Sequence, residues 1–77
     1  MTELRCVIGP RYKYAWNFRD ADELYDTWTD PAELRNLAGE PAFGEVRQAM
    51  RVRLREWLDS MNDPYAAALR VEDKEQP

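Results

Sequence analysis

The sequence predicts an α+β fold, in which a small antiparallel β-sheet of about three strands packs against one long C-terminal helix, with a short helix before it. Two N-terminal runs alternate apolar and polar residues, a turn signal separates them, and a later run repeats apolar residues every three or four positions. Hydrophobic residues are 44% and aromatic residues 12% of the 77 residues. That content suits one small core and is too high for a disordered tail.

The two alternating runs predict a β-hairpin. Residues 4–8 and 12–18 each have the period of two that is typical of strands. Gly9 and Pro10 separate the runs, and a proline presets the backbone for a turn. A three-residue loop over 9–11 brings the apolar positions of both runs to one face of the sheet. The predicted pairs are Ile8 with Tyr12, Cys6 with Tyr14, and Leu4 with Trp16.

A third strand and two helices follow the hairpin. Residues 23–28 predict the strand. Asp30 caps a short helix that ends near Gly39. Pro41 opens the long helix, and residues 62–64 terminate it. The apolar stripe of this helix is Phe43, Val46, Met50, Leu54, Trp57, Leu58 and Met61.

The long helix and the hairpin are predicted to share one core. The helical stripe would cover the apolar face of the hairpin, because each large side chain buried there stabilises the fold by about 1.5–3 kcal/mol. Residues 65–69 would add one further turn. Residues 71–77 are expected to form a frayed, charged tail.

Composition excludes several classes of function. The net charge of −4 disfavours non-specific binding to nucleic acid or to an anionic membrane. The chain has no histidine, the usual general base and commonest metal ligand, and its single cysteine cannot form an internal disulfide. No apolar run approaches the roughly 20 residues of a membrane helix. No signal peptide is expected in this chain, which predicts a cytoplasmic protein if Met1 is the true start.

Three groups of side chains are possible sites. Cys6 alternates with apolar neighbours, which favours a small buried hydrophobe over a reactive thiol. The acidic residues of 20–26 lack the glycine and the spacing of a calcium loop, which favours a solvated connector. Arg47, Arg51 and Arg55 recur at helical spacing, which favours a solvated helix flank over a groove for phosphate or sulfate.

The strand over residues 11–19 has a sharper alternative interpretation. It interleaves basic and aromatic residues, as strands that stack single-stranded nucleic acid do. The aromatic residues, however, share the face that the helical stripe needs. The sequence therefore predicts that the rings form a buried wall of the core.

Four short segments form a recognisable series along the chain. They are Arg11-Tyr12-Lys13-Tyr14, Glu23-Leu24-Tyr25-Asp26, Asp30-Pro31-Ala32-Glu33 with Asn36-Leu37-Ala38, and the helix from Pro41. In order and spacing they resemble the C-terminal subdomain of sulfatases of the alkaline-phosphatase-like superfamily, over about residues 5–64. The resemblance implies a small antiparallel sheet with the terminal helix packed on it. Thr27-Trp28 and Ile8-Gly9 depart from the family pattern, which has Leu and a polar Arg-Thr pair there.

The resemblance implies a domain division and places the chemistry elsewhere. Residues 1–64 would be a sulfatase C-terminal-like subdomain, and residues 65–77 a partly disordered C-terminal extension. Sulfatases convert the Cys or Ser of a Cys/Ser-x-Pro/Ala-x-Arg motif to formylglycine, which acts beside a calcium ion. Cys6 is not that residue, because Ile8 and Pro10 stand where the motif needs Pro/Ala and Arg. No catalytic, cofactor-binding or metal-binding residue is predicted, and calcium and formylglycine would belong to the catalytic portion.

Three hypotheses for function follow from the sequence. The first is a C-terminal subdomain or fragment of a sulfuric ester hydrolase, which completes the fold, borders the substrate cleft with Arg11 or Lys13, and is inactive alone. The second is a stand-alone protein-interaction module, and the third, least favoured, is a single-stranded nucleic-acid binder. The expected partners are the catalytic portion of a sulfatase or a second copy through the exposed sheet, with no nucleic acid and no membrane.

Overall fold

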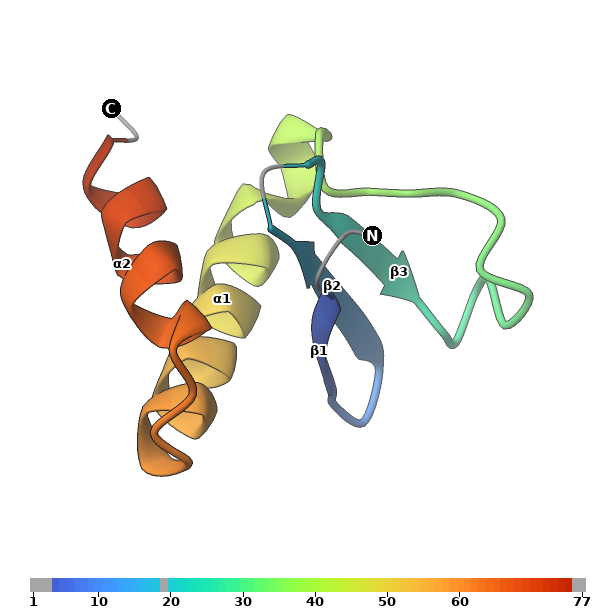
Figure 1. Cartoon of the computed structure of the whole chain (residues 1–77). Helices are drawn as coiled ribbons and strands as arrows, with labels where there is room; N and C mark the ends of the chain where they lie inside the picture. The colour runs from blue at the N-terminus through green and yellow to red at the C-terminus, as the bar shows by residue number, and fades with distance from the viewer. Residues whose placement is uncertain (1–3, 19, 76–77) are drawn as a thin grey trace.

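The computed structural model describes residues 4–18 and 20–75, with side chains as far as residue 71. Its elements are β1 (Leu4–Ile8), β2 (Tyr12–Asn17), β3 (Glu23–Asp26), a 3-10 turn η1 (Pro41–Phe43), α1 (Gly44–Ser60) and α2 (Tyr65–Glu75). The strands form one antiparallel sheet in the order β1-β2-β3. Figure 1 shows α1 between the sheet and α2. The predicted α+β class, with about three strands against a long helix, is confirmed.

One core joins the sheet to both helices. In the sheet, the side chains of Tyr14 and Leu24 are 0% exposed and that of Trp16 is 1% exposed. The helices and the loop before them supply the rest of this cluster, which is Leu37, Met50, Leu54, Leu58, Ala66 and Leu69. The aromatic strand is therefore a buried wall against the helix, as predicted. Two members of the predicted stripe, Trp57 and Met61, are about half exposed instead.

The predicted register of the hairpin is wrong by one residue. The observed partners are Leu4 with Asn17, Arg5 with Trp16, Cys6 with Ala15, Val7 with Tyr14, and Ile8 with Lys13. The Gly9 N–H donates to the Tyr12 carbonyl at 2.8 Å, so the turn spans four residues. A slip of one residue exchanges the two faces of a strand. Arg5 and Val7 therefore share the face of the aromatic wall, and Leu4 and Ile8 are exposed.

The predicted short helix after residue 30 is also wrong. Residues 27–40 form turns and extended segments. The Asp30 carboxylate accepts the backbone N–H groups of Leu34 at 3.0 Å and Arg35 at 2.9 Å. Glu33 has a φ of 56°, in the left-handed region, which a helix excludes. The Asp30 carboxylate accepts backbone N–H groups as a helix cap does, but here these hydrogen bonds stabilise a loop.

The ends of two further elements differ from prediction. β3 stops at Asp26, and the backbone turns at Thr27 instead of continuing to Trp28. Asn62 has a φ of 56° and ends α1 before Pro64, as expected. The chain then forms α2, which runs to Glu75 where one turn and a frayed tail were predicted. Two residues of α2, Ala66 and Leu69, are buried in the core.

Candidate functional site

The turn end of the hairpin presents an ordered arginine. The Arg11 Nη2 donates to Asp26 Oδ2 at 2.8 Å, and Nε is 3.1 Å from both carboxylate oxygens. The guanidinium also lies over two rings, 5.3 Å from the centre of Tyr12 and 4.9 Å from that of Trp28. Charge pairing and ring contact together fix the direction of this side chain, which is still 41% exposed.

Asp26 is the anchor of this arrangement. Its hydrogen bonds with Arg11, together with those from the backbone N–H groups of Trp28 and Thr29, lower the pKa of the carboxyl to about 2. The Trp28 Nε1–H donates to the Pro10 carbonyl at 3.1 Å, which closes the corner against the hairpin turn. Asp26 is therefore ionised at neutral pH, and we call Arg11, Asp26 and Trp28 the arginine corner.

Lys13, the second cation expected to face an anion, is already paired with a carboxylate of this chain. Its Nζ lies 2.8 Å from Glu33 Oε1, and this hydrogen bond raises the pKa of the lysine. The strained backbone of Glu33 thus places a carboxylate over the outer face of the sheet. Of the two predicted cations, Arg11 keeps the larger exposed surface.

A polar network crosses the inner side of the sheet to α1. The Tyr14 hydroxyl donates to Asp22 at 2.7 Å and accepts from Arg51 Nη1 at 2.8 Å, while Arg47 Nε donates to Asp22 at 2.6 Å. Burial, and then the bond to Asp22, raise the pKa of Tyr14, so the phenol stays neutral. The prediction of a solvated arginine flank is wrong for Arg51, which is 1% exposed. Arg55 is half-buried.

The acidic residues that flank β3 hold neighbouring side chains. Asp22 comes just before β3 and Asp26 ends it, so the two carboxylates lie at opposite ends of the strand and hold Tyr14 and Arg11 respectively. Among the residues that the structure describes, no group of three or more acidic, cysteine or histidine side chains converges as metal ligands. In the same part of the chain, no helix has the length and apolar content needed to cross a bilayer.

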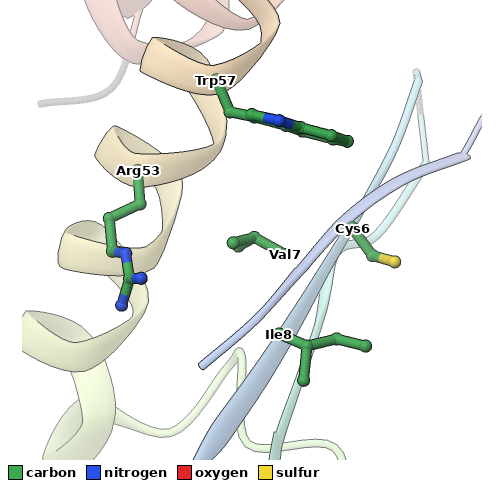
Figure 2. Close-up of a pocket in the computed structure, with 5 residues that line it drawn as sticks. All are labelled: Cys6, Val7, Ile8, Arg53 and Trp57. Carbon is green, nitrogen blue, oxygen red and sulfur yellow. The ribbon is translucent and has the colours of Figure 1, made fainter. Parts of the chain in front are cut away.

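A groove of about 370 Å³ runs between β1 and α1. Val7 and Trp57 extend into it from opposite walls, and Arg53 lies along its α1 side (Figure 2). Cys6 and Ile8 point away from α1, so the strand borders the groove at these positions with its main chain. Cys6 is a free, half-buried thiol outside the core, which corrects its interpretation as a buried hydrophobe.

Sequence reasoning missed the role of Asn36. Its Oδ1 accepts the N–H groups of Leu24 at 3.0 Å and Ala38 at 2.9 Å, and its Nδ2 donates to the Asp22 carbonyl at 3.0 Å. The N–H of Leu37 donates to the Leu24 carbonyl at 2.8 Å. This Asn36 clasp replaces a neighbouring strand along β3. The Asn-Leu-Ala signal was visible in the sequence, but it was assigned to a helix.

Comparison with known proteins identifies the family. No protein-family model matches the chain. It is 36% identical over 62 residues to the uncharacterized sulfatase YidJ of Escherichia coli K12, which is 80% of this chain and 12% of that protein. It is 37% identical over 62 residues to a delta 4,5-hexuronate-2-O-sulfatase of Bacteroides thetaiotaomicron, which is 79% of this chain and 13% of that protein.

A solved structure gives the same result for the fold. The structure of a 2-O GAG sulfatase superposes with a TM-score of 0.81 and 36% sequence identity, over 86% of this chain and 14% of that one. The chain thus spans only a small part of the length of the sulfatases that it matches. Sequence and fold therefore agree over most of this chain. The chain therefore belongs with the sulfatases, as the counterpart of their C-terminal subdomain.

Proposed function

We propose that this chain completes the fold of a sulfatase, a sulfuric ester hydrolase, and supplies none of the catalytic groups itself. The observation that carries the proposal is the coverage. About 80% of this chain matches 12% of a sulfatase at 36% identity, and the folds agree with a TM-score of 0.81. In this proposal residues 1–64 form the sulfatase-like part. The formylglycine and calcium come from the catalytic portion.

The arginine corner is the part that we propose to border the substrate cleft. Arg11 is fixed by Asp26, yet 41% of its side chain is exposed, so N–H groups remain for an anion. Trp28 is 67% exposed beside it and offers a flat apolar surface of the kind on which a sugar ring packs. Lys13 is a weaker candidate, because its ammonium group already pairs with the Glu33 carboxylate.

An interaction module that acts without a catalytic portion is the second candidate. It is favoured by the exposed apolar side chains on the β1 side, which are Leu4, Ile8, Trp57 and Met61. A nucleic-acid platform has no such support, since stacking needs accessible rings. Tyr14 and Trp16 are buried under α1.

A chimera tests the first proposal. This chain would replace the 62-residue stretch that it matches in the Bacteroides thetaiotaomicron delta 4,5-hexuronate-2-O-sulfatase, with the intact relative and a relative lacking that stretch as controls. We expect the chimera to be folded and to hydrolyse the 2-O-sulfated substrate of the relative, while the deleted form is inactive. A chimera no better than the deleted form would overturn the proposal.

A second measurement concerns the isolated chain. We expect no release of a chromogenic alcohol from an aryl sulfate ester by the purified 77-residue protein at any pH, because it lacks the formylglycine motif. Turnover above that of a heat-treated sample would contradict the assignment of all catalytic groups to the catalytic portion.

In the chimera, the cleft contact is tested by Arg11→Gln against Lys13→Gln. If Arg11 contacts the anionic substrate, its replacement raises KM much more than that of Lys13 does, when both variants are assayed at a temperature at which both are folded. Equal effects would remove Arg11 from the cleft.

A further inference from the structure

One carboxylate, that of Asp63, both starts α2 and holds this helix to the sheet. Its Oδ1 accepts the backbone N–H of Tyr65 at 2.8 Å, and Pro64 stands at the first helical position, so Asp63 is the cap of the helix. Its Oδ2 accepts Nε of Arg5, on β1, at 2.8 Å. The start of α2 and the inner face of β1 are therefore joined through a single side chain.

The ring of Tyr65 makes a second link between α2 and the sheet. Its centre lies 6.0 Å from that of Trp16 and 5.0 Å from that of Phe18, and both pairs meet edge to face. The Arg5 guanidinium lies 5.0 Å from the centre of the same ring. The first turn of α2 thus packs on the end of β2, where Trp16 is 1% exposed.

The rest of α2 is attached more weakly than its first turn. The helix has 11 residues, a length at which an isolated helix is marginal in water. Among its described side chains, those of Ala66 and Leu69 are buried. Arg70 pairs with Asp59 of α1, but both side chains are close to half exposed, and exposed pairs contribute little. The docking of α2 therefore depends on the contacts of its first turn.

We propose that α2 is a strap that opens and closes as a unit on an otherwise intact fold, with Asp63 as its latch. Asn62, whose φ is 56°, ends α1 before the strap begins, so α1 can stay folded while α2 opens. Opening breaks the ion pair between Arg5 and Asp63 and withdraws Tyr65 from Trp16, which uncovers an aromatic surface. The strap follows residues 1–64, so it is independent of the part that we propose to complete a sulfatase.

Acid weakens the latch. The hydrogen bond from Arg5, and then that from the Tyr65 N–H, lower the pKa of the Asp63 carboxyl. An unfolded aspartate has a pKa of about 3.9, so the latch is at full strength above about pH 4 and is lost as the pH falls through the lowered pKa of the closed form. The other titratable side chains near this junction are Tyr65 itself and Asp59, which is paired with Arg70.

Amide hydrogen exchange of the 77-residue chain at pH 7 tests the latch. Asp63→Asn removes the charge that Arg5 binds and keeps a helix cap, since Asn caps about as well as Asp. We expect the Leu69 amide to exchange at least roughly tenfold faster in this variant, because a hydrogen bond to a charged group is lost. The Tyr14 amide, in the central strand, reports on the sheet and should change by less than about threefold.

Asp59→Asn is the matched control, because it removes the exposed ion pair between α1 and α2 and leaves the latch in place. It should accelerate the Leu69 amide by less than about threefold. An equal effect of the two variants on Leu69, or no acceleration in Asp63→Asn, would overturn the assignment of Asp63 as the latch.

Two further outcomes concern the strap itself. Equal acceleration of Leu69 and Tyr14 in Asp63→Asn, or failure of that variant to fold, would show that α2 opens only with the whole chain and would overturn the proposal. Below about pH 4 the difference in Leu69 exchange between the original chain and Asp63→Asn should shrink, because protonation removes the same charge. A difference that persists in acid would also contradict the latch.

Discussion

The two edges of the sheet are finished in opposite ways. Along β3, the Asn36 clasp binds the N–H of Leu24, and the N–H groups of Leu37 and Asp30 donate to the carbonyls of Leu24 and Asp26. Along β1, Arg5 and Val7 pair with β2, so Cys6 and Ile8 direct their main-chain groups away from it. Among the described residues, no hydrogen bond reaches these outward groups. A loop of the chain therefore covers one edge of the sheet, and the described residues leave the other edge unpaired.

The largest effect is expected beneath the closed edge. Leu24→Ala removes a side chain that is 0% exposed in the core, so we expect a loss of about 2–5 kcal/mol in the free energy of unfolding. Val7→Ala, on the open strand and half-buried, is the control and should cost less than about 1.5 kcal/mol. Urea denaturation measures both. Equal losses would mean that the two edges are not different in packing.

The clasp itself should have the next largest effect. Asn36→Ala leaves the N–H groups of Leu24 and Ala38 without their acceptor, which should cost about 1–3 kcal/mol. The amide of Leu24 should also exchange faster. Gln48→Ala removes an exposed amide side chain and serves as the control. A loss for Asn36→Ala below about 0.5 kcal/mol would show that water replaces the clasp.

The ion pair of the arginine corner, at the end of β3, makes a pH-dependent contribution to the free energy of unfolding. An unfolded aspartate has a pKa of about 3.9, and that of folded Asp26 is about 2, so its stabilisation is full above about pH 4 and is lost as the pH falls towards 2. Asp26→Asn should therefore destabilise the chain at pH 7 and much less at pH 2.5. Thermal melts at the two pH values measure this. A difference that does not shrink in acid would contradict the assignment.

The smallest effect is expected on the outer face of the open strand. Ile8 is 68% exposed and lies outside the core, so Ile8→Lys should change the free energy of unfolding of the isolated chain by less than about 0.5 kcal/mol. Urea denaturation of the same preparation as Leu24→Ala gives the comparison. A loss above about 1 kcal/mol would show that this face is covered within the chain.

The two edges also differ in how well the sequence predicted them. Alternation identified β1, β2 and the aromatic wall, because the period of a strand is visible in residue types. The alternation of residue types did not determine the register of the hairpin. A three-residue turn and a four-residue turn are both compatible with a period of two, but they place opposite faces of β1 against α1. In the observed register Arg5 lies on the inner face, where it binds Asp63 at 2.8 Å and stacks on Tyr65. No local sequence pattern predicts contacts between residues that are so far apart in the chain.

The polar contacts were hidden for a related reason. Arg51 follows the spacing of an exposed flank, and only the fold brings the Tyr14 hydroxyl to it across 37 positions. Asn36 follows a capping signal, and only the position of β3 makes it an edge partner. The family motifs nevertheless contained both the Tyr14 and Asn36 positions. The resemblance to the family therefore pointed to these two positions, although secondary-structure propensity could not indicate what the side chains do there.

The Asn36 clasp also limits how this protein could aggregate. A sheet with two bare rims can recruit molecule after molecule and grow into a fibril. Here one rim is occupied by the chain's own loop, so two copies that met at β1 would exhaust each other's pairing capacity. Growth by strand addition would stop at a dimer.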